Sequence, residues 1–367
     1  MSAADKLAIF FTGATGYIGA SVLQRLLNHP DHEKFEVTAL VRNSEKAKKL
    51  EGSFGVKTVL GSLQDLDKLS ELAENAHIVI QVANCDNTEA MKAILSGLKR
   101  RHEKTGDVPL LIHTSGTGEI TDEARGDYVS ETIYSDLDIP LIESLPPTAI
   151  HRPVDLLVIA ADDEGYVRSH IIAPAVVYGV ASGPLFDEGI PANQHTVITQ
   201  MLVRSALDRG SMGVLGKGIS RWGDVHIDDT ADLHILLLDA LLSTPEKVSH
   251  GRNGWFFAAN GEHSMRELHE AVAEALFSLG RIKNKELIPY TKEDLDKYFW
   301  GDVRTFSIPR SSVDYVGGLL FSNSRCKAER GRLELGWAPT HTTGDFLKLV
   351  KPEVEMLVRK EDAKKGT

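Results

Sequence analysis

Three glycines near the start of the chain have the spacing of a phosphate-binding turn. Gly13, Gly16 and Gly19 lie in FFTGATGYIG, between an apolar run and an amphipathic segment. The first glycine permits a tight turn, the second lets a pyrophosphate approach the backbone, and the third allows close helix packing. A helix that starts here would offer free N–H groups and a positive dipole end to the phosphates. The segment therefore predicts a dinucleotide-binding loop.

The end of the next apolar run bears on which dinucleotide binds. A site for NAD has an acidic residue about 20 residues after the loop, where it binds the ribose 2′-OH. The segment VTALVRNSEK instead has Val41 and Arg42 at that point, with Lys46 nearby. Arginine stays charged and can bind a phosphate through two hydrogen bonds. We therefore expect NADP(H) rather than NAD(H), although Arg42 could also be a surface arginine at a strand end.

Several further residues could exchange a proton or a hydrogen bond with a substrate oxygen. Ser115 and Thr117 lie in HTSGTG, after an apolar run, where ligands of open α/β sheets bind. His151 stands at the start of an expected helix and can donate a proton near neutral pH. Tyr178 follows another apolar run, and Tyr134 lies in a long polar segment that could fold over the site. Each also has a plainer explanation: loop hydrogen bonding, a helix start, a packed ring or an exposed surface.

These residues lie at the junctions of a regular pattern in which apolar runs alternate with amphipathic segments. The runs lack polar alternation, as expected of strands that are covered on both faces. Such a rhythm is typical of a doubly wound parallel sheet. The expected strands are residues 7–13, 35–42, 56–61, 77–84, 109–116 and 167–179. The main expected helices are residues 16–29, 65–76, 88–104, 150–165, 196–210 and 225–242.

The pattern predicts an α/β chain with two parts. A doubly wound parallel Rossmann sheet is expected over residues 1–180 and 221–250. A smaller, discontinuous α+β substrate-binding region is expected over residues 181–220 and 251–345. Residues 346–367 are expected to form a C-terminal helix and a solvated tail.

Composition restricts the class of partner. The chain has 367 residues and a formal net charge of -11, which argues against a nucleic-acid or membrane-surface binder. No apolar run is long enough to span a bilayer, and the chain enters a strand almost at once, so no signal peptide is expected. Cys85 and Cys326 form no disulfide or metal-binding pattern. We expect a cytoplasmic protein with a small-molecule substrate and no metal, and a homodimer remains an open option.

Four segments together resemble the extended short-chain dehydrogenase/reductases, which include nucleotide-sugar epimerases and dihydroflavonol-type reductases. They are TGATGYIG, APAVVYG, VHIDDTADLHILLL and CKAERGRLELGWAPT, and the resemblance covers nearly the whole chain. Where the family usually has an aspartate near the adenine, LGSLQD has Ser62, which can still hydrogen-bond the base. The glycine loop and the resemblance together imply cofactor contacts at Gly13, Thr15, Gly16, Tyr17, Ile18, Gly19, Arg42, Lys46, Ser62, Ala83, Ser115, His151, Pro174, Val176 and Val177.

The chain departs from this family at the catalytic pair. The family uses a Tyr and a Lys four residues apart on the helix after the fifth strand, but none of the eight tyrosines here has Lys four residues later. Aligning His151 or Arg152 with the Lys places Pro147 at or near the Tyr position. The usual proton donor is therefore missing, and Ser115, Thr117, His151 and Tyr178 are the candidates to replace it.

The sequence thus predicts an atypical NADP(H)-dependent oxidoreductase that acts on a small carbonyl or hydroxyl compound with a non-standard proton donor. The lost catalytic pair leaves open a second hypothesis, a non-catalytic protein that senses NADP(H) and regulates a partner. A nucleotide-sugar epimerase or a lyase is a third hypothesis, which ranks lower because epimerase chemistry normally uses the missing tyrosine.

Overall fold

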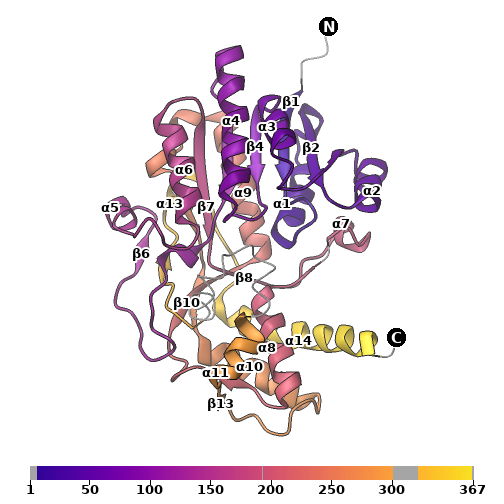
Figure 1. The fold of residues 1–367 in the computed structure, drawn as a ribbon, viewed down its shortest axis with the longest axis vertical. Helices are drawn as coiled ribbons and strands as arrows, with labels where there is room; N and C mark the ends of the chain where they lie inside the picture. Colours follow the sequence, from indigo (N-terminus) through magenta and orange to yellow (C-terminus); the bar gives the residue numbers. More distant parts are fainter. Residues whose placement is uncertain (1–5, 192, 301–320, 366–367) are drawn as a thin grey trace.

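A parallel sheet of seven strands forms the larger part of the molecule. The computed structural model describes residues 6–191, 193–300 and 321–365. Within them the strand order is β11-β7-β5-β4-β1-β2-β3, and each neighbouring pair is parallel. The strands are β1 (Leu7–Thr12), β2 (Phe35–Val41), β3 (Lys57–Leu60), β4 (Ile78–Gln81), β5 (Leu110–Thr114), β7 (Arg168–Pro174) and β11 (Trp255–Ala258). The predicted doubly wound Rossmann sheet is confirmed (Figure 1).

Helices cover the sheet because each presents a buried apolar stripe to it. In one group α3 (Leu66–Glu74) packs on α4 (Thr88–Thr105), which packs on α6 (Arg152–Asp163). In another, α1 (Tyr17–Leu27) packs on α9 (Ile227–Ser243). A further helix, α2 (Ser44–Phe54), connects β2 to β3. The helices and the strands share one large apolar core.

The order of the strands identifies where a ligand would bind. Strand β1 lies between β2 and β4, so the direction of winding reverses at β1. In open α/β sheets, ligands bind outside the carboxyl ends of the strands at such a reversal. The glycine loop follows β1, and the segments after β4 and β5 end at the same edge.

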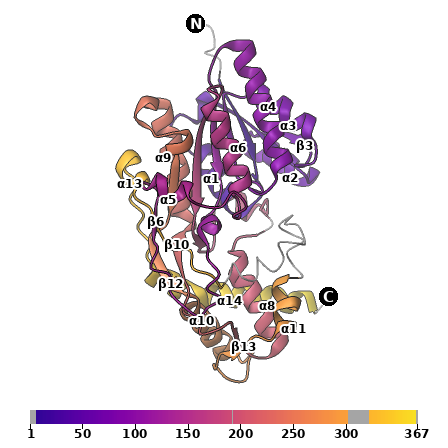
Figure 2. The ribbon, with the colours of Figure 1, turned by 60° about the vertical axis from the view of Figure 1, so that its left-hand side comes forward.

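A second, smaller part lies beyond this edge of the sheet, in the lower half of Figures 1 and 2. Its three-stranded sheet has β8 (Val176–Tyr178) parallel to β10 (Arg221–His226), which is antiparallel to β12 (Gly261–Ser264). Its main helices are α8 (Val197–Arg209), α10 (Met265–Ser278) and α14 (Thr343–Lys365). A separate apolar core holds these elements together.

The smaller elements complete the part of the chain that the structure describes. The short helices are α5 (Ile139–Glu143), α7 (Pro184–Asp187), α11 (Lys292–Leu295), α13 (Arg330–Leu335) and the single turns η1 (His32–Lys34), η2 (Thr117–Ile120), η3 (Pro245–Lys247), η4 (Gly251–Asn253) and η5 (Asp296–Trp300). The short strands are β6 (Tyr134–Ser135), β9 (Gly213–Val214), β13 (Ile288–Pro289) and β14 (Cys326–Lys327).

The structure corrects the expected division of the chain in two places. Residues 221–226, expected in the Rossmann part, form strand β10 of the smaller sheet, whereas residues 255–258, expected in the substrate-binding region, form strand β11 at the edge of the large sheet. The single strand expected over residues 167–179 is two strands, because the chain leaves the large sheet at Pro174 and pairs with β10 from Val176 onward. Part of the predicted substrate region, residues 301–320, lies outside the described residues.

Candidate functional site

The glycine loop has the geometry of a close turn between β1 and α1. Gly13 has a φ of +82°, and a Cβ atom there would lie 2.7 Å from the carbonyl carbon of Val82, at the end of β4. Gly16 caps α1, and a Cβ there would meet only the Gly13 oxygen, at 3.3 Å. A Cβ on Gly19 would overlap that same oxygen. The third glycine therefore allows the close packing that the sequence predicts, and its contact is with the turn at Gly13.

A first cavity, of about 310 Å³, lies on one side of this loop. It is lined by Thr12, Gly13, Thr15, Gly16, Leu40, Arg42, Gly61, Ser62, Leu63, Gln64, Val82, Ala83, Asn84 and Asn87. Six predicted cofactor residues are therefore brought together here. Arg42 is exposed at the end of β2, and the pKa of Lys46 is lowered by burial and by the positive charge of Arg42. The Ser62 hydroxyl donates to Asp65 at 2.8 Å, so its proton is already engaged.

A second cavity, of about 350 Å³, lies on the other side of the loop. It is lined by Tyr17, Ile18, Asp86, Ser115, Gly116, Thr117, Gly118, Ile150, His151, Pro174, Ala175, Val176, Val177, Thr196, Val197, Ile198, Met201 and Trp222. Because Gly16 lines the first cavity and Tyr17 the second, the two cavities flank the N-terminus of α1. The Tyr17 hydroxyl donates to the carbonyl of Gly179 at 2.6 Å, which ties the loop to the smaller part.

His151 is held in the second cavity by an unusual backbone and by two side chains. It has a φ of +67°, one of two described non-glycine residues with positive φ, and it precedes α6. Its Nδ1 lies 2.8 Å from a carboxylate oxygen of Asp86 and 3.3 Å from Sγ of Cys85. On the other side of the ring, Cβ atoms at Gly116 and Gly118 would lie 3.2 and 2.8 Å from Nε2. The two glycines after β5 therefore make room for this imidazole.

The charge of His151 is set by these neighbours. Burial alone would lower the pKa of His151, but Cys85 and Asp86 raise it well above its ordinary value. Burial also raises the pKa of the Cys85 thiol, with His151 opposing this effect. A thiol that keeps its proton carries no charge, so we assign the stabilisation of the imidazolium to the Asp86 carboxylate. With Nδ1 hydrogen-bonded to Asp86, Nε2 is the ring nitrogen left to act on a ligand.

The same three residues have the donor types of a divalent-metal site. One ligand atom from each of Cys85, Asp86 and His151 lies within 4.8 Å of the other two. Thiolate, carboxylate and imidazole all bind zinc. The sequence indicated no metal site, because His151 is 65 positions from Asp86 and no spacing pattern joins them.

A buried polar network lies directly beneath the cavity. The Ser115 hydroxyl donates to Asp155 at 2.7 Å, and Nε2 of His113 lies 3.0 Å from the other oxygen of Asp155. Burial and the adjacent Asp155 raise the pKa of Glu119 well above its usual value, with Arg152 opposing at 2.9 Å. Ser115 therefore has no proton to give to a substrate in this arrangement, and Arg152 is turned away into an ion pair.

Thr117 differs from Ser115. It is only 1% exposed and lines the cavity, yet its Oγ1 has no hydrogen-bond partner among the described residues. Its backbone carbonyl accepts a 2.6 Å hydrogen bond from Ser324, which fixes the loop. Buried hydroxyls are normally hydrogen-bonded, so an unpartnered one beside a cavity is suited to bind a ligand.

Comparisons with known proteins bear on this arrangement. Residues 13–131 match a family model described as NAD(P)H-binding. Over 95–99% of both chains, the fold is similar to UDP-glucose 4-epimerase from Thermotoga maritima (17% identical, TM-score 0.60) and to dTDP-glucose 4,6-dehydratase from Bacillus anthracis, solved with NAD (16% identical, TM-score 0.60). The chain has the fold of an extended short-chain dehydrogenase/reductase. The resemblance stated from the sequence is confirmed.

Two curated relatives match this chain over most of its length. One is the oxidase ucsJ of an Acremonium species, 29% identical over 380 residues and covering 98% of both chains. The other is a protein of Schizosaccharomyces pombe named only as uncharacterised, 26% identical, covering 92% of this chain and 96% of its own.

Helix α6 is the helix on which the resemblance places Tyr and Lys. It begins after His151, and Asp155 lies four residues beyond His151. His151 lines the cavity, and Asp155 is fully buried against Ser115. Of the two residues aligned with the Lys, His151 lines the cavity, whereas Arg152 pairs with Glu119 at 2.9 Å.

Several predicted site residues do not reach either cavity. Tyr178 is fully buried, stacks on Phe346 and donates its hydroxyl to the carbonyl of Thr342 at 2.9 Å, so its geometry does not support a proton-donor role. Tyr134 lies in β6, beside β14, and does not fold over the site. Gly19 and Lys46 are not among the described residues that line these two cavities. Packing of distant segments decides each of these outcomes.

Sequence reasoning also missed residues that the structure places at the site. Asp86 and Cys85 follow β4, at the same edge as the glycine loop, and this position was the available signal for them. Asp155 was visible as an acidic residue one helical turn after His151, on the same face. The residues that they contact are far away in the sequence: Asp86 contacts His151, and Asp155 contacts Ser115.

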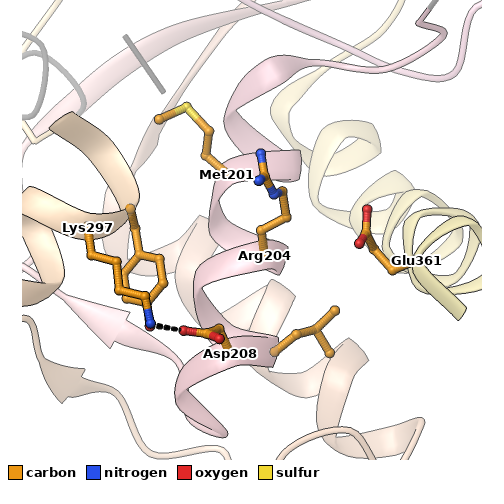
Figure 3. Close-up of a pocket in the computed structure, with 7 residues that line it drawn as sticks. Met201, Arg204, Asp208, Lys297 and Glu361 are labelled. Atoms are coloured by element: carbon orange, nitrogen blue, oxygen red, sulfur yellow. Dashed lines mark hydrogen bonds and ion pairs between the residues drawn. The ribbon is translucent and has the colours of Figure 1, made fainter. Parts of the chain in front are cut away.

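A third cavity, of about 440 Å³, lies in the smaller part between α8, η5 and the end of α14 (Figure 3). It is lined by Met201, Arg204, Leu207, Asp208, Lys297, Tyr298 and Glu361. Lys297 pairs with Asp208, and charges of both signs are present. Met201 also lines the second cavity, so the two are neighbours along α8.

Over the described residues, no helix is long and apolar enough to cross a membrane.

Proposed function

We propose that this chain is an NAD(P)H-dependent oxidoreductase that interconverts a small carbonyl compound and its alcohol, with His151 as the proton donor. The observation that carries the proposal is the position of His151. It lines the cavity next to the glycine loop, and Asp86 holds its Nδ1 at 2.8 Å. A bound nicotinamide would supply or accept the hydride.

The roles of the chain's own residues follow from their contacts. The imidazolium of His151 gives the Nε2 proton to the substrate oxygen during reduction and takes it back during oxidation. Asp86 holds the Nδ1 proton and keeps the ring in one orientation. Thr117 offers a hydroxyl for a hydrogen bond to the same oxygen. Ser115 and Asp155 hold the floor of the cavity in place.

NADP(H) is the proposed cofactor on the basis of Arg42 and Lys46. Two cations close enough for one to lower the other's pKa are suited to a 2′-phosphate, which would relieve their repulsion. The relatives support the redox reading: one relative is named an oxidase, and one structural neighbour was solved with NAD.

The test is NAD(P)H consumption by the purified protein with a panel of carbonyl compounds. His151→Asn should lower kcat by about 10²–10⁴-fold, the range of general acid catalysis, with cofactor affinity unchanged. Asparagine tolerates positive φ, so this variant keeps the backbone conformation and isolates the loss of the proton. His32→Asn, in the exposed turn η1, is the matched control and should leave kcat unchanged.

Two results would contradict the proposal. If the His151→Asn variant turned over at the wild-type rate, His151 would not be the proton donor. Tight NADPH binding with no turnover of any carbonyl or alcohol would instead favour the alternative of a non-catalytic NADP(H) sensor.

A further inference from the structure

We infer that the substrate is an uncharged, largely apolar molecule whose only polar end is the reacting oxygen, rather than a nucleotide sugar. This inference deepens the proposed function and rests on it. It comes from how polar and apolar side chains are divided between the two ends of the second cavity.

The polar groups are gathered at one end. Asp86, Ser115, Thr117 and His151 come from the segments after β4 and β5 and from the start of α6. Two of them are already committed, since Asp86 binds His151 and Ser115 donates to Asp155. The groups left to bind a substrate are Nε2 of His151 and the unpartnered Oγ1 of Thr117. The glycines on both sides of Thr117 lie against Nε2 of His151, so these two residues are close neighbours in the cavity.

The residues that the smaller part contributes to the lining are largely apolar. Val176 comes from β8, Val197, Ile198 and Met201 come from the first two turns of α8, and Trp222 lies on β10 beside β8. The indole nitrogen of Trp222 donates to the carbonyl of Ser322 at 2.8 Å, so the ring has no hydrogen left to give a ligand. Thr196, the N-cap residue of α8, is the polar residue among those that the smaller part contributes to the described lining.

No lysine or arginine is among the described residues that line this cavity. A diphosphate needs cations or several backbone N–H groups, and a buried anion without them is strongly disfavoured. Arg204 and Lys297 line the third cavity, on the far side of Met201, where Lys297 pairs with Asp208. UDP-glucose, which is bound in one structural neighbour, would therefore find no lysine or arginine among the described lining residues, and the His151 imidazolium is already paired with Asp86.

Size points in the same direction. At about 350 Å³ the cavity is at the small end of ligand pockets, and a nicotinamide ring would fill part of it. The remaining space suits a compact apolar body attached to a carbonyl or hydroxyl group.

The experiment measures binding to the protein saturated with the oxidised dinucleotide, so that no turnover is needed. The probes are linear methyl ketones from butanone upward, the corresponding keto acids with a terminal carboxylate, and UDP-glucose. Calorimetry should show Kd falling about fourfold with each added methylene until the cavity is full, the effect of burying one CH₂. Keto acids of matched length should bind at least tenfold more weakly, and UDP-glucose should not bind.

A variant on the apolar wall provides the internal control. Ile198→Arg, at a half-buried position on α8, should reverse the preference so that the keto acid binds more tightly than the ketone. Val197→Arg, at an exposed position on the same turn, should give a weaker reversal and covers the case in which Ile198→Arg fails to fold.

Affinity that is independent of chain length, or wild-type binding of keto acids or UDP-glucose as tight as that of ketones, would overturn the inference. Its failure is separable from failure of the proposed function. Length-dependent ketone binding without NAD(P)H consumption would keep the substrate class and reject the oxidoreductase. NAD(P)H-dependent turnover that does not vary with the length of the ketone would keep the oxidoreductase and reject the substrate class.

Discussion

The two cavities beside the glycine loop are built in different ways. The first is shaped by backbone: Gly13 turns with positive φ against the end of β4, and Gly16 leaves its surface open. The second is shaped by side chains from segments far apart in the sequence. His151, at the start of α6, is held by Asp86, which follows β4, and Thr117 follows β5. A backbone site can keep its form while the side chains opposite change. A glycine loop of this kind can therefore persist in a chain that lacks Tyr-x-x-x-Lys.

The largest effect is expected where the backbone site is filled. Gly16→Val should abolish detectable dinucleotide binding, because the branched side chain occupies the space in front of the helix N-terminus. Gly16 has a φ of −96°, and a Cβ there meets only one atom, so the variant should remain folded. Calorimetry and circular dichroism measure the two properties.

Gly19→Ala provides the contrast within the same loop. Its Cβ would overlap the Gly13 oxygen, so the variant should lose about 1–3 kcal/mol of stability, as overpacked positions do. Unchanged cofactor affinity in Gly16→Val would show that the pyrophosphate does not cross this loop, and the comparison between the two cavities would fail.

The side-chain cavity should be sensitive to pH through Asp86. The pKa of His151 is raised, so the imidazolium persists above the ordinary histidine range and the rate of carbonyl reduction falls only as pH rises through the raised value. Asp86→Asn removes the anion, so this descending limb should move to lower pH. Each unit by which the pKa falls costs about tenfold in rate at pH values above it. A pH profile of kcat in both proteins measures the shift.

A chelator separates this proton chemistry from a metal at the same residues. Treatment with EDTA should leave wild-type turnover unchanged, and Cys85→Ser should retain most of it, with Cys326→Ser as the matched control. Loss of activity in EDTA that zinc restores would mean that Cys85, Asp86 and His151 hold a metal, and the proton-donor assignment would then be wrong.

The same contrast explains how much the sequence could predict. The sheet, its helices and the glycine loop follow from local patterns, because apolar periodicity and glycine spacing act over a few residues. Other features depend on contacts between distant segments. They are the pairing of His151 with Asp86, the burial of Tyr178 in the second core, and the positions of β10 in the smaller sheet and β11 in the large sheet. No local pattern carries that information, so the sequence alone leaves four candidate residues for the proton donor.

An intermediate effect is expected at the far end of the first cavity. Arg42→Ala should weaken NADPH binding by about 1.5–3 kcal/mol, the range for hydrogen bonds to a charged group, and should leave NADH binding unchanged. Calorimetric titration of both cofactors gives the two affinities. Lys48→Ala, at an exposed position on α2, is the matched control. Wild-type NADH binding equal to or tighter than NADPH binding would contradict the proposed preference.

The smallest effect should come from Tyr178, although the sequence made it a candidate donor. Burial raises the pKa of Tyr178, and its hydroxyl donates to the carbonyl of Thr342, just before α14. Tyr178→Phe removes that hydrogen bond and leaves the ring stacked on Phe346, so the protein should lose about 0.5–1.5 kcal/mol of stability. Turnover should stay within twofold of wild type, because the hydroxyl points into the second core rather than the cavity. Chemical denaturation and steady-state kinetics measure both. A fall in kcat as large as that expected for His151→Asn would mean that the proton comes from the smaller part of the molecule, and the site would need to be rebuilt around β8.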